Sequence, residues 1–281
     1  MTMAIDLTGN TAIITGATRG IGRALSLALA AAGANVVGTA RDPGPAEALG
    51  KEIDALGATF EFVQADAGSW EHCHRVAATA LDRFGRVDIL LNNAGTSLPQ
   101  VRIDEMDEES WRAVAGPTLD GPLFMSRAVL PAMRAQRSGT IITIASGAGI
   151  QGLATMGAYG MAKAAAIQLA RVIAVENLEF GVRANALIVG AVATELSQAS
   201  LVARGRDMFG PDWVPPVPEA DGAGSAMEAL MIPPENLADS VLLLCAPEAR
   251  EINGAVIAID RGFSAGAYNS ALVGLAAAGA L

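Results

Sequence analysis

Short runs of aliphatic and β-branched residues alternate along the chain with longer, alanine-rich segments. The runs show little polar alternation, which is typical of strands buried on both faces of a parallel sheet. The alanine-rich segments are long enough to form the helices that cover such a sheet. The pattern therefore predicts one α/β domain over residues 1–281, doubly wound, with a mainly parallel seven-stranded sheet and helices on both faces. The strands are predicted at residues 11–15, 35–40, 59–64, 87–92, 140–145, 183–188 and 255–259.

Residues 191–234 interrupt this alternation. They contain the stretches "FGPDWVPPVP" and "DGAGSA", which are too rich in proline and glycine for regular structure and too apolar for a solvated loop. We expect this region to form a lid over a binding site. Its apolar inner face is predicted to come from five large side chains, Met208, Phe209, Trp213, Met227 and Met231. A tail of small residues, 264–281, follows the last predicted strand.

The charge balance narrows the range of partners. The chain has 29 acidic and 19 basic residues and a net charge of -10, which argues against binding to nucleic acid or to an anionic membrane surface. The first residues show no basic segment followed by an apolar run, so we expect no signal peptide and predict a cytoplasmic location. The two cysteines, Cys73 and Cys245, are too few for a disulfide framework.

Two short clusters look functional but are interpreted as ordinary helix surface. The stretch "EHCHR" places His72, Cys73 and His74 together, yet positions 72 and 74 point to different faces of a helix and no second ligand cluster occurs, so no metal site is predicted. The acidic stretch at 104–110 is predicted as a helix start, where carboxylates interact favourably with the helix dipole.

The first predicted strand is followed by "TGATRGIGRALSLALA", which places Gly16, Gly20 and Gly22 at a strand-to-helix turn. Glycines at such a turn let the backbone approach a ligand closely, and the unpaired N–H groups of the helix N-terminus bind a pyrophosphate. The turn follows the first strand of an alternating α/β pattern, so it predicts a Rossmann-type dinucleotide site.

The end of the second predicted strand bears on the choice of dinucleotide. Binders of NAD(H) place an acidic residue there for the ribose hydroxyls, whereas binders of NADP(H) use a cation for the 2′-phosphate. Arg41 follows the strand, and Arg19 of the glycine turn can reach the same corner. Asp42 argues for NAD(H) unless it turns to solvent. We therefore favour NADP(H) over NAD(H).

The stretch "AYGMAKAAAIQLA" places Tyr159 and Lys163 four residues apart, on one face of a predicted helix. An unperturbed tyrosine has a pKa of about 10, too high for easy proton exchange at neutral pH. A neighbouring ammonium favours the phenolate, so we expect Lys163 to lower the pKa of Tyr159 and make it a general acid and base.

These motifs resemble the classical short-chain dehydrogenases/reductases (SDRs) from about Asp6 to Phe263. They occur in family order: "TGATRGIG", "NNAG" after the fourth strand, Ser146 after the fifth, the Tyr159–Lys163 pair, and "NALIVGAVAT" from Asn185 to Thr194. The resemblance implies a homotetramer and a set of coenzyme-binding residues: Gly16, Thr18, Arg19, Gly20, Ile21, Gly22, Arg41, Asp66, Asn92, Ala94, Gly95, Tyr159, Lys163, Gly190, Val192 and Thr194. Within it, Asp66 is expected at the adenine and Thr194 at the nicotinamide amide.

The resemblance also implies roles in catalysis. Tyr159 exchanges a proton with the substrate oxygen, Ser146 donates a hydrogen bond to that oxygen, and Lys163 holds the nicotinamide ribose as well as acting on Tyr159. Thr118 stands where the family usually has an asparagine that anchors a water of the proton relay. Val189 stands where the family commonly has a proline.

Two further expectations concern helices. Pro117 and Pro122 lie beside Thr118 in a predicted helix, and proline removes a donor and clashes with the preceding turn, so we expect this helix to be broken. The helix that carries Tyr159 has alanines that would allow a symmetry-related helix to pack closely. These alanines are Ala162, Ala165, Ala166 and Ala170.

Three functions remain open. The first is an NADP(H)-dependent carbonyl reductase for a bulky hydrophobic ketone, with residues 96–100 and 147–155 and the lid as pocket walls. The second is an NAD-dependent alcohol dehydrogenase that works oxidatively. The third is a coenzyme-binding protein with little activity, conceivable because of Thr118 and the two prolines. A coenzyme-independent lyase is disfavoured, because the glycine turn and Lys163 are both intact.

Overall fold

The computed structural model describes residues 5–214 and 231–267. Within these ranges, seven strands form one sheet in the order β3-β2-β1-β4-β5-β6-β7, and every pairing is parallel. The predicted seven-stranded, doubly wound α/β fold is confirmed. The strands are β1 (Thr11–Thr15), β2 (Asn35–Ala40), β3 (Phe60–Gln64), β4 (Ile89–Asn92), β5 (Gly139–Ser146), β6 (Val182–Val189) and β7 (Val256–Ile259).

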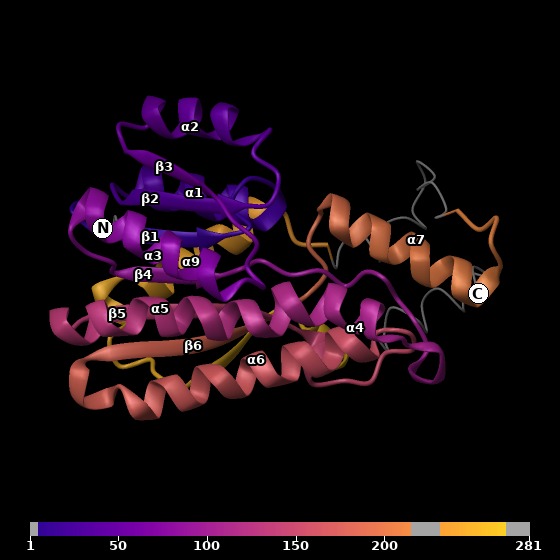
Figure 1. Ribbon diagram of the computed structural model, residues 1–281. Coiled ribbons are helices and arrows are strands. Elements are labelled where there is room, and N and C mark those ends of the chain that lie inside the picture. Colours follow the sequence, from indigo (N-terminus) through magenta and orange to yellow (C-terminus); the bar gives the residue numbers. More distant parts are fainter. Residues whose placement is uncertain (1–4, 215–230, 268–281) are drawn as a thin grey trace.

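Helices cover both faces of the sheet (Figure 1). Helices α1 and α9 pack together on one face, and α3 and α5 pack together on the other, beside α6. The α-helices are α1 (Gly20–Ala31), α2 (Ala46–Ala55), α3 (Trp70–Phe84), α4 (Glu108–Ala115), α5 (Gly121–Gln136), α6 (Gly157–Glu176), α7 (Glu195–Phe209) and α9 (Pro234–Cys245).

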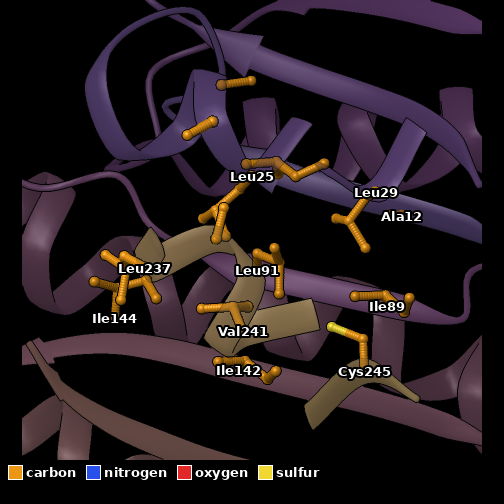
Figure 2. Close-up of a cluster of buried hydrophobic side chains, with 14 of the residues drawn as sticks. Ala12, Leu25, Leu29, Ile89, Leu91, Ile142, Ile144, Leu237, Val241 and Cys245 are labelled. Carbon is orange, nitrogen blue, oxygen red and sulfur yellow. The ribbon is translucent and has the colours of Figure 1, made fainter. Parts of the chain in front are cut away.

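The core between α1, α9 and the sheet consists of aliphatic side chains from distant parts of the chain. Figure 2 shows Leu25 and Leu29 of α1 and Leu237 and Val241 of α9 meeting the strand residue Leu91. Burial of one such side chain stabilises a fold by about 1.5–3 kcal/mol, so this cluster fixes both helices against the sheet. It thereby fixes the glycine turn, because α1 begins where that turn ends.

The strand order reverses direction between β1 and β4, which are neighbours in the sheet although β2 and β3 lie between them in sequence. Ligands of doubly wound sheets bind in the crevice outside the carboxyl ends of the strands at this switch point. The glycine turn leaves β1 there, and the segment from Asn93 to Gly95 leaves β4 beside it.

The helix predicted to break at Pro117 and Pro122 is continuous, so that prediction is wrong. Between α4 and α5 the chain forms one π-helical turn, Gly116–Asp120, which we call the π-turn. The N–H of Gly121 donates to the carbonyl of Gly116, five residues back. The wider turn shifts the hydrogen-bond register so that a helix can accommodate residues without an N–H donor.

The first part of the predicted irregular lid is a regular helix, which corrects the expectation for residues 191–234. Helix α7 begins after Thr194, whose side chain caps it by accepting a hydrogen bond from the N–H of Ser197 at 3.2 Å. Its 15 residues contain no proline. Residues 215–230, which include Met227, and residues 268–281 of the tail lie outside the described ranges, as do the side chains of Met208 and Phe209.

Three of the four alanines predicted to form an outer packing face of α6 are buried within the chain. Ala162, Ala166 and Ala170 are fully buried, and Ala165 is half-buried. The exposed face of α6 instead carries Met161 and Val175. A symmetry-related helix would therefore meet larger apolar side chains than the sequence indicated.

Helix α6 is the one described helix that is long and apolar enough to cross a membrane by length and composition, and 44% of its apolar window is buried inside the protein. It packs on strands β5 and β6, as the core helix of an α/β domain does. Its apolar character is therefore explained by the core.

Candidate active site

The glycine turn after β1 is tight enough to require its glycines. Gly16 and Gly20 have φ of 66° and 50°, a region that side chains rarely adopt. A Cβ on Gly22 would lie 1.9 Å from the carbonyl oxygen of Gly16. The side chain of Asn93 holds the turn from the β4 side, donating to the carbonyls of Thr15 at 2.9 Å and Gly16 at 3.2 Å.

The N-terminus of α1 leaves backbone donors available for a ligand. Arg19 precedes the helix in extended conformation, and its side chain makes no capping hydrogen bond. The first N–H groups of an α-helix have no partner within the helix, and together with the helix dipole they bind anionic groups. The turn and this uncapped terminus fit the pyrophosphate of a dinucleotide.

Opposing charges meet at the end of β2. Arg19 forms an ion pair with Asp42, and both side chains remain more than half exposed. Asp42 also accepts a hydrogen bond from the N–H of Gly44 at 2.9 Å. Asp42 therefore faces Arg19 rather than only solvent, whereas Arg41 is exposed. The corner can offer either a cation or a carboxylate to the ribose end of a coenzyme.

A cavity of about 110 Å³ lies at the carboxyl end of the sheet. Its lining unites residues from β5, β6, α6 and the turns after β1 and β4: Ile21, Asn93, Gly95, Ile144, Ala145, Ser146, Tyr159, Lys163, Val189, Gly190, Val192, Thr194, Leu196 and Ser197. The structure thus brings the three predicted catalytic residues Ser146, Tyr159 and Lys163 to one space.

Not every predicted coenzyme residue lines this cavity. Asn92 is buried, and its amide donates to Ser126 of α5 at 3.1 Å. The adjacent Asn93 lines the cavity instead, because β4 ends at Asn92 and the chain then turns over the strand ends. Gly16, Thr18, Gly20, Gly22 and Ala94 belong to the turns beside the cavity, while Arg41 and Asp66 follow β2 and β3 farther along the sheet edge.

Asn93, Leu196 and Ser197 were not among the predicted site residues. Asn93 could have been found from "NNAG", since both asparagines stand at the carboxyl end of a strand. Leu196 and Ser197 belong to the first turn of α7, and no local signal in the sequence placed that turn over the cavity.

The predicted catalytic pair, Tyr159 and Lys163, lies in the first two turns of α6. The Lys163 ammonium is 5.5 Å from the centre of the Tyr159 ring and donates to the backbone carbonyl of Ile144 at 2.6 Å. The side chains of Ser146 and Tyr159 line the same cavity. Ser146 also accepts a hydrogen bond from the N–H of Ala148 at 3.2 Å, which fixes its position at the end of β5.

The ionisation of the pair differs from the expectation. Burial raises the pKa of the Tyr159 phenol above its usual value, and the hydrogen bond with Ser146 opposes this rise. Burial also lowers the pKa of Lys163 from 10.5 to about 8. Desolvation disfavours both charged forms, and among the described residues no carboxylate contributes to either shift. The pKa of Tyr159 is thus raised by burial and not lowered as the spacing to Lys163 predicts.

Thr118 lies fully buried in the π-turn, where its hydroxyl is hydrogen-bonded to Thr96 of the loop after β4. The hydroxyl accepts from the N–H of Thr96 at 3.1 Å and donates to the carbonyl of the same residue at 3.3 Å. A Cβ on Gly95 would lie 3.2 Å from the Thr118 hydroxyl and 3.5 Å from the Lys163 ammonium, so all three are close neighbours. Thr118 thus ties the loop after β4 to the π-turn.

Comparisons with known proteins show which proteins this chain is similar to. The family model described as short chain dehydrogenase matches residues 10–204. The short chain dehydrogenase/reductase astE of Aspergillus oryzae is 35% identical over 261 residues, 92% of this chain and 96% of that protein. The 3-oxoacyl-[acyl-carrier-protein] reductase of Synechocystis sp. is 38% identical over 193 residues, 68% of this chain and 78% of its own. The crystal structure of levodione reductase matches with a TM-score of 0.82 and 28% identity, over 92% of this chain and 98% of that chain.

Proposed function

This chain belongs to the short-chain dehydrogenase family of oxidoreductases, and we propose that it transfers a hydride between NADP(H) and a ketone or secondary alcohol. The observation that carries the proposal is the meeting of Ser146, Tyr159 and Lys163 in one cavity beside the glycine turn. A hydroxyl pair and a buried amine beside a dinucleotide turn are suited to proton exchange at a carbonyl oxygen.

The proton steps follow from the state of the side chains. The raised pKa of Tyr159 keeps its phenol protonated at neutral pH, so it can donate a proton to a carbonyl oxygen during reduction. Ser146, which lines the same cavity, would donate a hydrogen bond to the same oxygen. The coenzyme supplies the hydride.

Lys163 is proposed to act after the coenzyme binds. Its ammonium is held by the Ile144 carbonyl at the cavity wall and is lined up beside Gly95. Hydroxyl groups of a coenzyme ribose would be further acceptors for its remaining N–H groups, and they would favour its charged form. The positive charge would then stabilise a Tyr159 phenolate after proton donation.

NADP(H) is the proposed coenzyme because Arg41 is exposed at the end of β2 and Arg19 lies at the same corner. A 2′-phosphate would compete with Asp42 for Arg19. The alternative, an NAD-dependent alcohol dehydrogenase, is favoured by one observation: Asp42 already faces this corner and could accept hydrogen bonds from ribose hydroxyls.

The proposed substrate is a bulky hydrophobic ketone. Two of the similar proteins are named as reductases, a 3-oxoacyl-[acyl-carrier-protein] reductase and a levodione reductase. These names support the reductive direction of the reaction. The walls would come from residues 96–100 and 147–155 and from α7, whose Leu196 lines the cavity. A small hydrophilic carbonyl compound as the preferred substrate would contradict this assignment.

We further propose that the protein works in the cytoplasm as a homotetramer. The exposed apolar side chains of α6 support self-association, since Val175 is 79% exposed and Leu178, just beyond the helix, is 71% exposed. Large apolar side chains gathered on one face mark an interaction surface.

The proposal is tested by following NADPH and NADH oxidation with ketones of graded size, together with Tyr159→Phe. Removing the proton donor should lower kcat about 10²- to 10⁴-fold while leaving the Kd for the coenzyme unchanged. Turnover of every ketone at the same rate by wild type and variant would overturn the assignment of Tyr159. Coenzyme binding without any turnover would instead support the third function, a binding protein.

A further inference from the structure

His72 holds the residue expected at the adenine end of the coenzyme. Its Nδ1 accepts a hydrogen bond from the backbone N–H of Asp66 at 3.1 Å. Nδ1 is therefore the unprotonated nitrogen, and Nε2 carries the proton when the ring is neutral. The sequence pattern had assigned His72 only to the surface of a helix.

The loop between β3 and α3, residues 66–69, is also held by bonds within itself and by the thiol of Cys73 in α3, which donates to the carbonyl of Ala67 at 3.2 Å. The Asp66 carboxylate accepts from the N–H of Gly68 at 2.9 Å, and the Asp66 carbonyl accepts from the N–H of Ser69 at 3.1 Å. Ser69 then caps α3 by accepting from the N–H of His72. The His72 ring therefore bonds the N–H of Asp66 to the helix, beside the bond that Cys73 makes to Ala67.

The other side of the loop is fixed by backbone contact with the π-turn. A Cβ on Gly68 would lie 2.9 Å from the carbonyl carbon of Gly116. A Cβ on Gly121, where α5 begins, would lie 3.1 Å from the side chain of Ala67. These close contacts restrict a shift of the loop toward α5, while the His72 hydrogen bond acts at its other end, at Asp66.

Asp66 lies close to the proposed ribose corner. The N–H of Ala65 donates to the carbonyl of Ala40 at 3.0 Å, and the side chain of Gln64 donates to the carbonyl of Arg41 at 3.0 Å. The segment leading to Asp66 is thus bonded directly to the end of β2. A displacement of Asp66 would alter the adenine end of the coenzyme site and leave Ser146 and Tyr159 in place.

We propose that His72 is a positioning residue for the coenzyme, which orients Asp66 toward the adenine through the Asp66 N–H. The inference rests on the proposed function, because it requires a dinucleotide to bind at this edge of the sheet. Its effect is on coenzyme affinity and not on the proton transfer at Tyr159.

The test compares three variants. His72→Leu removes the acceptor, His72→Asn places an amide oxygen the same number of bonds from the backbone as Nδ1, and His74→Asn is a matched control on the same helix. The His74 ring is hydrogen-bonded to Arg127 at 2.9 Å and packs against Trp70, both of which lie outside residues 66–69. The readouts are the Kd values of NADPH and of adenosine 2′,5′-bisphosphate, with the melting temperature of each variant.

Loss of one hydrogen bond is expected to raise both Kd values about five- to tenfold in His72→Leu. His72→Asn should restore most of the affinity, His74→Asn should bind like wild type, and kcat at saturating NADPH should be unchanged in all three.

Wild-type affinity in a folded His72→Leu protein would overturn the inference. If that variant does not fold, weak binding by a folded His72→Asn protein would overturn it equally. A wild-type protein that binds neither NADPH nor NADH would overturn the proposed function first and this inference with it.

Discussion

Burial is the largest influence on the pKa values of Lys163 and Tyr159, larger than the effect of either side chain on the other. Both line the cavity, where burial disfavours an ammonium and a phenolate alike. With a pKa of about 8, Lys163 still carries its positive charge at pH 7. Burial nevertheless outweighs any acidifying effect of this charge on Tyr159, because the pKa of the phenol is raised above its usual value.

The lowered pKa of Lys163 predicts a pH dependence of stability. The unfolded chain binds this proton up to pH 10.5 and the folded chain only up to about pH 8, so the unfolding free energy should rise with pH above 8. Between pH 8 and 9 this group should contribute about 1 kcal/mol.

The measurement is the urea-unfolding free energy of wild type and Lys163→Met in the absence of coenzyme. The difference between the two isolates Lys163 from Cys73 and Cys245, whose raised pKa values of about 12 reduce stability above pH 9. If the unfolding free energies of the two proteins changed with pH in parallel, Lys163 would not be desolvated.

The exposed position of Arg41 at the end of β2 predicts a preference for NADPH over NADH. Replacing it with alanine removes an exposed cation at the end of β2 and should raise KM for NADPH about tenfold while changing KM for NADH little. Steady-state kinetics with both coenzymes checks this, with Arg112→Ala of α4, an exposed arginine paired with Glu108, as a surface control. An equal rise in KM for NADPH and NADH would mean that Arg41 does not bind the 2′-phosphate.

The π-turn between α4 and α5 brings together segments that are distant in sequence. It lets a segment with two prolines remain helical, and it directs Thr118 at the loop after β4. Its backbone also meets Gly68, so three segments distant in sequence converge at one turn. A glycine is required where two backbones approach this closely.

Gly68→Ala should therefore destabilise the protein. The new Cβ would lie 2.9 Å from the Gly116 carbonyl carbon, and overpacking against backbone costs about 1–3 kcal/mol. Thermal unfolding measures the loss. Gly152→Ala is the matched control, since its Cβ would meet nothing within 4 Å. Equal melting temperatures for the two variants would contradict the close contact.

At the level of the assembled protein, the exposed face of α6 predicts self-association. Met161, Val172 and Val175 line this face and Leu178 follows it, and water contact with such side chains is unfavourable. Two copies of the face would bury them, while the small alanines remain in the core of each copy.

Val175→Glu should lower the mass measured by light scattering, because a carboxylate buried at the contact would be unpaired. Glu109→Gln, an exposed change on α4, is the control and should leave the mass unchanged. A wild-type mass equal to that of one chain would contradict the proposed tetramer.

Periodicity and turn residues were enough to predict the seven strands, the parallel sheet and the glycine turn. These features depend on residues close together in sequence, such as the apolar run of β1 and the glycines that follow it. The motifs of the site could also be predicted, because Ser146, Tyr159 and Lys163 lie at the ends of predictable elements.

The remaining features depend on contacts between distant segments. Asp42 faces Arg19 across 23 positions, the His72 ring meets the start of the Asp66 loop, and Ala166 faces the sheet because α6 lies across β5 and β6. The direction of the Tyr159 pKa follows from burial, a property of the packed molecule. Desolvation and contacts between distant segments exist only after folding. Tertiary structure alone therefore decided the ionisation of the site's side chains and the contacts that position them.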